Sequence, residues 1–384
     1  MDALTTPSNW QRVRLGDIAE IKRGASPRPI ENPKWFCTNS NVGWVRISDI
    51  SKNSRFLYKT AQKLSKKGIE KSRFIKQNSL IMSMCATIGK PIITKIDTCI
   101  HDGFVVFENP KIDLNYLYYF LCYIEKEWLE SGQQGSQVNL NVDLIKNKEV
   151  FYPKDLNEQI AIANILSDVD RYLYSLDALI LKKESVKKAL SFELLSQRKR
   201  LKGFNQNWQK VRLGDICEIV KGQQINKISL NNTDKYPVIN GGIDFLGYTN
   251  KFNVSKNTIA ISEGGTCGYV RFMTSDFWSG GHNYSLQKIS NKVNNLCLYH
   301  ILKSYEKDIM KLGVGSGLKN IQLKALKDFK ILLPPLNEQA AIANILSGLD
   351  HEIISLKNKK RQFENIKKAL NHDLMSAKIR VLKK

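Results

Sequence analysis

The chain has 384 residues, a length that predicts two or three domains, and 42% of its residues are hydrophobic, enough for ordinary cores. Its 59 Lys and Arg against 36 Asp and Glu give a formal net charge of +23, which indicates a polyanionic partner such as nucleic acid; a basic surface that serves only solubility is the alternative. No run approaches the roughly 20 apolar residues that span a bilayer, and residues 1–7 lack the pattern of a signal peptide, so we expect a cytoplasmic protein without membrane contact.

A 15-residue motif, WQRVRLGDIAEIKRG, occupies residues 10–24 near the start of the chain. The segment that follows contains short β-rich runs bounded by turn residues, which predict strands at 42–47, 80–84, 91–94 and 103–107. A helix is predicted at 115–130. Between residues 22 and 76 this segment carries 14 Lys or Arg and only three acids, which makes it the more basic part of the chain.

Residues 154–203 are predicted as one long helix. Asn157 is expected to be its N-cap, Glu158 lies in the first turn, and no glycine interrupts the segment from 157 to 202. Apolar residues then recur at heptad spacing, which is typical of coiled-coil packing, and a helix of this length needs a partner for its apolar stripe. These residues are Leu166, Val169, Leu173, Leu176, Ile180, Leu190 and Leu194.

The second half of the chain repeats this order. Residues 208–222 match 10–24 at 11 of 15 positions, and residues 336–350 match 156–170 at 12 of 15. Strands are predicted at 236–239, 258–262 and 268–272, a helix at 295–311, and a second long helix at 335–384. The segments 25–135 and 223–315 have little obvious likeness, so a duplicated frame holds two different inserts.

The two long helices are expected to pair with each other, because their heptads keep the same register and residues 201–203 offer a tight return. The alternative is that each helix packs on its own domain. Lysines at 183, 187, 360 and 367 interrupt the apolar seam, so the pairing could be imperfect or loosened midway.

Candidate DNA-binding residues are basic side chains in and just before the first insert and basic, amide and imidazole side chains in and just after the second. Lys and Arg neutralise phosphates, Arg can read guanine, and Asn or Gln can read adenine in the major groove. Each residue alone could instead be a turn former or a solvated side chain. The candidates are Arg23, Arg28, Lys34, Arg46, Arg55, Lys63, Lys66, Lys67, Gln223, Gln224, Lys227, Asn240, Arg271, His282, Asn283 and Lys319.

The motifs of common enzymes are missing from the sequence. The seven cysteines form no CxxC pair and the five histidines no HExxH motif, so no metal site is predicted. Residues 333–336 lack the polar and aromatic members of a methyltransferase tetrad, and Gly89 and Lys90 lack the upstream glycine of a P-loop. We therefore predict no catalytic residues; an enzyme with an unrecognised site is the alternative.

Together, the duplicated layout, the Trp-x-x-Val-x-Leu-Gly-Asp-Ile openings and the Leu-Asn-Glu-Gln-x-Ala-Ile-Ala closings resemble the specificity subunit of type I restriction-modification systems. The resemblance covers nearly the whole chain. It implies that each insert is a target-recognition domain for one half of a DNA site, and that the long helices form an antiparallel spacer. It also implies that the repeated frame docks two methyltransferase subunits, which restriction/translocase subunits join. S-adenosylmethionine, ATP and Mg²⁺ are then expected on those partners and no cofactor on this chain.

The predicted fold class is α+β: two globular mixed α/β recognition domains separated by two long antiparallel coiled-coil helices in a pseudo-two-fold internal repeat. The predicted boundaries are 1–153 and 204–334 for the recognition domains and 154–203 and 335–384 for the helices. The predicted function is non-catalytic reading of an asymmetric bipartite site in double-stranded DNA. A stand-alone, two-headed DNA-binding regulator without enzymatic partners is the alternative.

Overall fold

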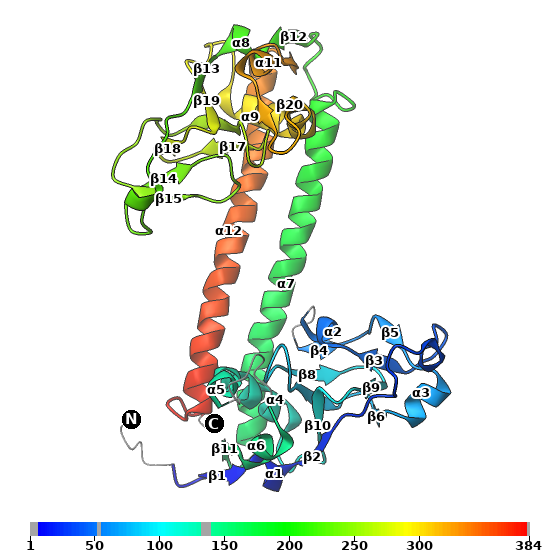
Figure 1. Cartoon of the computed structure of the whole chain (residues 1–384). Coiled ribbons are helices and arrows are strands. Elements are labelled where there is room, and N and C mark those ends of the chain that lie inside the picture. Colours follow the sequence, from blue (N-terminus) through cyan, green and yellow to red (C-terminus); the bar gives the residue numbers. More distant parts are fainter. Residues whose placement is uncertain (1–6, 52–54, 132–139, 382–384) are drawn as a thin grey trace. The chain divides into compact units, whose positions relative to one another are not determined.

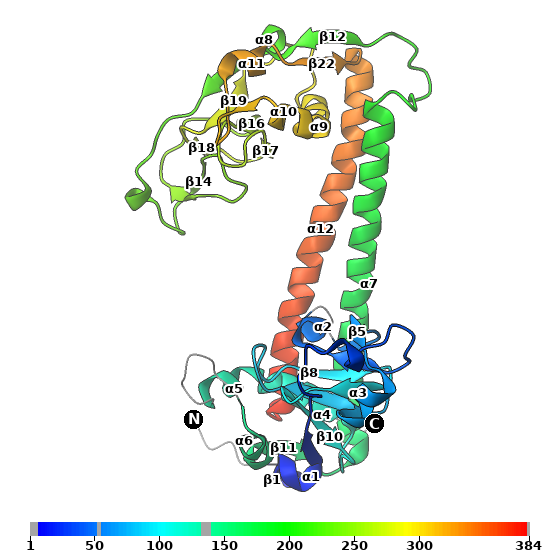
Figure 2. The same cartoon turned by 45° about the vertical axis from the view of Figure 1, so that its right-hand side comes forward.

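The structure, a computed structural model, describes residues 7–51, 55–131 and 140–381. The chain divides into two compact units, Met1–Ser175 with Lys360–Lys384, and Leu176–Lys359. Each unit contains one mixed α/β domain and part of each of two 40-residue helices, α7 (Leu156–Leu195) and α12 (Leu336–Met375) (Figures 1 and 2). Residues of both helices therefore belong to each unit.

The domain of the first unit precedes α7 in the chain. Its elements are β1 (Trp10–Arg14), α1 (Leu15–Ile18), β2 (Glu20–Arg23), η1 (Pro33–Trp35), β3 (Gly43–Val45), α2 (Ile47–Ser51), β4 (Phe56–Leu57), β5 (Gln62–Lys63), α3 (Lys66–Glu70), β6 (Arg73–Ile75), β7 (Leu80–Ser83), β8 (Pro91–Thr94), β9 (Thr98–Ile100), β10 (Phe104–Glu108), α4 (Leu114–Tyr123), α5 (Glu125–Ser131), α6 (Val142–Asn147) and β11 (Glu149–Pro153).

The domain of the second unit lies between α7 and α12. Its elements are β12 (Gln209–Arg212), α8 (Leu213–Ile216), β13 (Glu218–Lys221), η2 (Lys227–Ser229), β14 (Tyr236–Ile239), β15 (Gly247–Thr249), β16 (Thr258–Ser262), β17 (Val270–Met273), β18 (Trp278–Ser279), β19 (Asn283–Gln287), α9 (Asn295–Ser304), α10 (Glu306–Met310), β20 (Gly313–Val314), β21 (Asn320–Ile321), α11 (Leu323–Lys327) and β22 (Lys330–Leu333).

The central sheets of the two domains share the order of four strands, to which the first domain adds β4, although their sequences differ. The first has the strand order β2-β10-β7-β8-β4 and the second β13-β19-β16-β17. In both domains the first strand pairs antiparallel with the last strand, β1 with β11 and β12 with β22. The repeat therefore extends into the inserts, where the sequence comparison had found little likeness.

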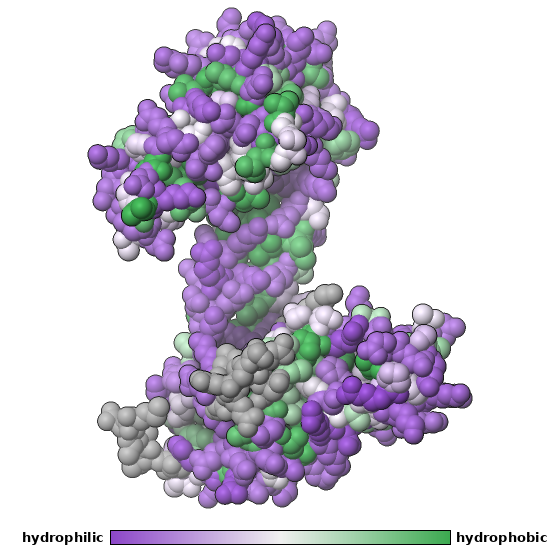
Figure 3. Space-filling view, viewed as in Figure 1, coloured by the Kyte–Doolittle hydropathy of each residue, from purple (hydrophilic) through white to green (hydrophobic). Residues whose placement is uncertain are grey.

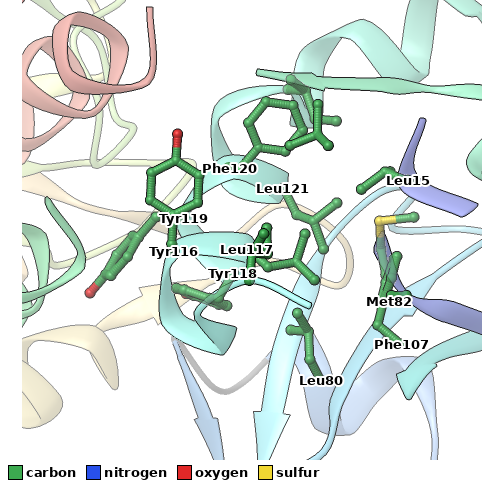
Figure 4. Close-up of a cluster of buried hydrophobic side chains, with 14 of the residues drawn as sticks. Leu15, Leu80, Met82, Phe107, Tyr116, Leu117, Tyr118, Tyr119, Phe120 and Leu121 are labelled. Atoms are coloured by element: carbon green, nitrogen blue, oxygen red, sulfur yellow. The ribbon is translucent and has the colours of Figure 1, made fainter. Parts of the chain in front are cut away.

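Both faces of the first central sheet are buried. Leu80, Met82 and Phe107 pack on one face against Leu117 and Leu121 of α4 (Figure 4). Ile81 and Val106, which alternate with them along the strands, lie in a second core on the opposite face. Burial on two faces explains the unbroken apolar runs of β7 and β10, since a half-exposed strand would alternate apolar and polar residues.

Three local predictions need correction. The single helices expected at 115–130 and 295–311 are each two helices, with breaks at Ile124 and Tyr305. The N-cap of α7 is not Asn157: the helix begins at Leu156, and Asp155 Oδ1 accepts a hydrogen bond from the Asn157 N–H at 2.9 Å.

The long helices also end earlier than predicted, at Leu195 and Met375. Gln197 and Ala377, at equivalent positions of the repeat, adopt φ of 61° and 58°. The N–H of the second residue after each then bonds back across the last turn, from Lys199 to the Glu193 carbonyl and from Ile379 to the Asp373 carbonyl. These are the left-handed endings that glycine usually supplies, so the sequence reading continued the first helix to Gly203.

The opening and closing motifs of the first unit contact each other through Glu158, which is 8% exposed. Its carboxylate accepts hydrogen bonds from Trp10 Nε1 at 3.3 Å and Asn9 Nδ2 at 2.9 Å. Arg380, after the end of α12, donates to the same carboxylate at 3.2 Å. One buried anion therefore joins the first strand, the start of α7 and the segment after α12.

Glu338 makes the same junction in the second unit and is 1% exposed. It accepts from Trp208 Nε1 at 3.0 Å and from Arg200 Nε and Nη2 at 2.8 and 2.7 Å. The next residue, Gln339, accepts from the Asn294 N–H that starts α9 and donates to the Pro334 carbonyl. Gln159 bonds in the same way to Asp113 and Pro153. The repeated Trp and Glu-Gln residues are conserved between the two halves because they hold each domain on its helices.

The long helices pair antiparallel within each unit. In the second unit, Lys183 of α7 pairs with Glu352 of α12 at 2.7 Å, and Lys187 of α7 pairs with Asp350 of α12. The partner residue moves back along α12 as the lysine moves forward along α7, which is the order of an antiparallel pair. In the first unit, Lys367 pairs with Asp170 at 2.5 Å. The pairs Lys187–Asp350 and Lys367–Asp170 occupy equivalent positions of the repeat. Lys183, Lys187 and Lys367 therefore bind acids on the opposite helix, and Lys360 lies 3.6 Å from Glu364 of its own helix.

We predict that Glu338→Ala lowers the free energy of unfolding by about 3 kcal/mol, because it leaves the buried Trp208 indole and the partly buried Arg200 without their acceptor. Glu338→Gln keeps an acceptor and should cost less. Chemical denaturation of the full chain measures both changes. Asp328→Ala is the matched control: this exposed carboxylate lies 3.6 Å from Arg212, and its loss should cost less than about 1 kcal/mol. Equal losses for Glu338→Ala and Asp328→Ala would contradict the junction.

A second prediction concerns the ion pair between Lys187 and Asp350 in the helix seam. Lys187→Glu and Asp350→Lys should each destabilise the chain, because each places like charges in a seam where the side chains are only 25% and 30% exposed. The double variant restores opposite charges and should recover about 1 kcal/mol relative to the sum of the single changes. Urea denaturation of the four chains checks the cycle, and strictly additive losses would show that the two charges do not interact.

Candidate nucleic-acid interface

Three candidate arginines of the first unit meet at the loop between β9 and β10. Arg23 Nε donates to the Asp102 carbonyl at 2.7 Å, and Arg28 Nη2 lies 3.0 Å from Asp102 Oδ2. Arg46 directly follows β3, whose last residue, Val45, pairs with Ile100 of β9. We call Arg23, Arg28, Arg46, His101 and Asp102 the first loop face.

The electrostatics of this face favour a neutral imidazole beside an ionised carboxylate. Burial lowers the pKa of His101, an effect that Asp102 opposes and the charge of Arg46 reinforces. Burial favours the protonated form of Asp102, but the hydrogen bond from Ser26 and the Arg28 charge hold the pKa of Asp102 below its ordinary value. The three exposed arginines thus exceed the one carboxylate at this face, which leaves positive charge for a phosphate or a base edge.

Four candidate lysines form a second group around η1, β5 and α3. Lys34, Lys63, Lys66 and Lys67 are all exposed. Lys34 Nζ lies over the Trp35 ring, 4.3 Å from its centroid. Ser65 holds Lys34 next to α3, because its hydroxyl donates to the Lys34 carbonyl and also accepts from the Gly68 N–H in the first turn of α3.

Arg55 does not lie on the surface with the other candidates. It is 7% exposed, and its guanidinium donates to Tyr119 Oη at 2.9 Å, Ser167 Oγ at 2.6 Å and Asn115 Oδ1 at 2.6 Å. The side chain therefore links the insert to α4 and α7. In the second unit Ser347, the equivalent of Ser167, instead bonds to His300 Nε2 at 3.0 Å, and burial lowers the pKa of His300 to about 4.

In the second unit, four candidate residues surround the loop that leads into β19. Asn240 Oδ1 accepts from the His282 N–H at 3.0 Å, and the Gln223 N–H donates to the Ser279 carbonyl at 2.8 Å. The Gln224 amide lies against Gly281, where an added Cβ would come within 2.5 Å of its Nε2. We call Gln223, Gln224, Asn240, Glu263 and His282 the second loop face.

Glu263 lies under this face and is 8% exposed. Its Oε1 is 2.7 Å from Lys221 Nζ and 3.2 Å from the Tyr284 hydroxyl. Burial is the main reason that the pKa of Tyr284 is raised to about 12, and the negative charge of Glu263 adds to this increase. His282 Nδ1 lies 4.0 Å from Glu263 Oε2 on the exposed side. The second face thus combines amides and an imidazole with one buried carboxylate.

The remaining candidates of the second unit are placed differently. Asn283 is 2% exposed and donates to Ser279 Oγ at 3.2 Å, so its side chain is internal, contrary to expectation. Arg271 is half-buried and donates to the Gly242 carbonyl at 2.8 Å, and burial lowers its pKa. Lys227, in η2, and Lys319, beside Gly313, are exposed. Figure 3 shows hydrophilic side chains over most of the visible surface of each unit.

The last glycine of the repeated opening motif lets the backbone pack closely at both loop faces. A Cβ on Gly24 would lie 2.0 Å from the His101 carbonyl oxygen, and one on Gly222 would lie 2.2 Å from that of Gly280. Only glycine lets β2 and β13 end against these loops. Both glycines belong to the repeated motif, but the residues that they pack against lie more than 50 positions away in the sequence.

A turn that was not predicted from the sequence lies next to each face and is shared by the two domains. Residues 83–89 and 262–268 both read Ser-x-x-x-Thr-x-Gly, and each segment connects two neighbouring sheet strands, β7 to β8 and β16 to β17. Both turns use left-handed residues at the same places, Ala86 and Gly89 in the first, Gly265 and Gly268 in the second. This spaced pattern was visible in the sequence and could have aligned the two inserts.

The described residues include no group of three or more His, Cys, Asp or Glu that could hold a metal ion. The cysteines described are free, and burial raises the pKa of Cys99 to about 11 and those of Cys217 and Cys297 to about 12, so these thiols are poor nucleophiles. Within the same residues, no helix is long and apolar enough to cross a membrane.

A family model described as the type I restriction modification DNA specificity domain matches residues 7–183 and 205–365. The chain therefore belongs to this family, as the sequence motifs predicted. The two matches each begin before an opening motif and extend past the closing motif, so the family domain appears twice.

Several relatives are named as type I specificity subunits. One from Mycoplasma pneumoniae is 39% identical over 165 residues, 41% of this chain and 44% of that relative; one from Mycoplasma genitalium is 36% identical over 154 residues, 40% of each. The chain thus matches less than half the length of these two. A relative from Methanocaldococcus jannaschii, named as the specificity subunit of type I restriction enzyme MjaX, is 28% identical and matched over 98% of this chain and 95% of its own.

Two solved structures have the same fold. The crystal structure of the type I restriction-modification S subunit from M. genitalium covers 97% of both chains with a TM-score of 0.70 at 19% identity. A chain from work on complex assembly and conformational transition of the type I system covers 96% of this chain and 98% of its own, with a TM-score of 0.59 at 16% identity. The predicted fold class, two mixed α/β domains and two long antiparallel helices in an internal repeat, is confirmed.

We predict that Gly222→Ala destabilises the second unit by more than about 1 kcal/mol, because its Cβ would meet the backbone carbonyls of Ser279 and Gly280. Gly348→Ala is the matched control: this glycine lies inside α12 with nothing within 4 Å of an added Cβ, so the same change should stabilise the helix by about 0.5–1 kcal/mol. Thermal unfolding of both variants measures the difference, and two shifts of the same sign would contradict the close approach at Gly222.

Proposed function

We propose that this chain is the non-catalytic specificity subunit of a type I restriction-modification complex, acting on double-stranded DNA in the cytoplasm. The observation that carries the proposal is the double match to the specificity domain, each copy placing different side chains on one repeated sheet. A repeated scaffold with unlike faces suits a protein that reads two unlike half-sites.

The chemistry of the two faces supports this reading. In the first unit, exposed arginines and lysines suit phosphate oxygens, and an arginine can bond bidentately to guanine. In the second unit, Gln223, Gln224 and Asn240 suit adenine, which offers a donor and an acceptor to one amide. Different half-sites, and therefore an asymmetric bipartite target, are the consequence.

The repeated frame would dock two copies of one methyltransferase subunit. Leu156 and Leu336 are 53% and 46% exposed, and Ile165 and Ile345 are both 37% exposed, so apolar residues of the closing motifs are open at the same positions of both copies. Two equal surfaces recruit two equal partners. Restriction/translocase subunits would join through that complex, and S-adenosylmethionine, ATP and Mg²⁺ would be bound by the partners.

The long helices would set the spacing of the half-sites. Half-sites that are read from one side of a duplex lie about one helical turn apart, roughly 34 Å. The length of a spacer built from paired helices depends on the number of residues in both helices. The distance between half-sites would therefore be a property of the frame rather than of the inserts.

Exchange of an insert tests the proposal. Replacing residues 25–150 by the equivalent segment of another family member should change only one half-site, since each insert reads one half. The readout is the genome-wide pattern of methylated bases in cells that carry the chain with its methyltransferase and restriction partners. Unchanged chain and cells without the chain are the controls. A change in both half-sites would contradict the two-reader model, and failure to copurify with a methyltransferase would favour a stand-alone regulator.

A further inference from the structure

The two carboxylate oxygens of Glu263 differ in their hydrogen bonding. Oε1 binds Lys221 and Tyr284, whereas Oε2 is buried and has no hydrogen-bond partner among the described residues. The side chain is 11% exposed. A buried acceptor without a partner costs free energy, so its retention at a surface loop calls for a ligand that completes it.

The loops around Glu263 are rich in glycine and pack closely against one another. The adjoining loops contain Gly241, Gly264, Gly265, Gly280 and Gly281, and added Cβ atoms on these residues would each come within 3 Å of a neighbouring atom. His282 Nδ1 lies 4.0 Å from Oε2, and 54% of the His282 side chain is exposed. Exposed side chains change rotamer within nanoseconds, so His282 can uncover the carboxylate.

We infer that Glu263 is a specificity-determining residue of the second recognition domain, whose Oε2 accepts a hydrogen bond from the exocyclic amino group of one base in the major groove. The inference rests on the proposed function. Adenine N6 and cytosine N4 offer this donor, whereas guanine O6 and thymine O4 place an acceptor at the corresponding edge and are repelled by a carboxylate. Glu263 therefore selects adenine or cytosine at one position.

The equivalent position of the first domain has different chemistry. Met84 follows β7 as Glu263 follows β16, and the N–H groups of both bond to the facing loop, at Gly103 and His282. Met84 has no charge and is 3% exposed. The rule that Glu263 imposes thus applies to one half-site only.

Glu263→Gln is the sharpest test. Lys221 requires an acceptor, so the glutamine Oε1 stays on Lys221 and its Nε2 takes the place of Oε2, which turns an acceptor into a donor. We expect the preferred base at one position of one half-site to change from adenine or cytosine toward guanine or thymine. The full chain, with and without the substitution, is used to select binders from random-sequence duplex DNA, and the enriched sites are sequenced.

Glu218→Gln is the matched control, because Glu218 begins the same strand that ends at Lys221, and its salt bridge with Lys288 is exposed. It should leave both half-sites unchanged. If Glu263→Gln enriches the same sites as the unaltered chain, or if Glu218→Gln changes the site equally, the inference is overturned. If the unaltered chain enriches no bipartite sequence, the proposed function itself fails.

Base analogues distinguish the two sources of the amino group. A duplex with purine in place of adenine, or 2-pyrimidinone in place of cytosine, lacks the exocyclic amino group at that position. For the base that is contacted, the unaltered chain should lose about tenfold in affinity or more, as expected for a hydrogen bond to a charged group. Glu263→Gln should discriminate less between the natural base and its analogue. Equal discrimination by both chains would overturn the contact.

Discussion

The architecture of each unit depends on one buried carboxylate. Glu158 and Glu338 each bind a tryptophan indole from the start of the domain's opening motif and an arginine from beyond the end of a helix. A buried charge is tolerated only when it is paired and hydrogen-bonded, so the three segments must come together or the anion is left exposed to an apolar core. The same requirement, met twice, explains why the sequence repeats where it does.

Between these junctions the inserts are free to differ. The central sheets are defined by apolar residues that alternate between two cores, and any set of suitable apolar side chains satisfies that demand. The loops at the sheet ends are constrained mainly by close backbone approach, at Gly24 and Gly222. Residues that neither fill the cores nor touch at these points, such as Arg28 and Gln224, can therefore change without loss of the fold.

Sequence reasoning succeeded where periodicity carries the information. The heptad residues Leu176, Ile180 and Leu194 are buried as predicted, and the strands at 236–239 and 258–262 coincide with β14 and β16. It failed where a residue depends on distant partners. Seam lysines such as Lys187 looked disruptive because their acids lie on the other helix, and Arg55 looked like a surface cation because Tyr119 and Ser167 are far away in the chain. The helix ends were misplaced because Gln197 and Ala377 adopt a conformation that their identity does not suggest.

The division of the chain also has a consequence for its biosynthesis. The second unit is contiguous, Leu176–Lys359, whereas the first takes residues from both ends of the chain. Arg380 completes the hydrogen bonds of Glu158 from 222 residues away. On the ribosome, the first unit therefore emerges first but is completed last, after the second has been fully translated. Until then the Glu158 carboxylate and the apolar start of α7 await residues not yet made, so premature termination near residue 360 would spare the residues of the second unit and leave the first unfinished.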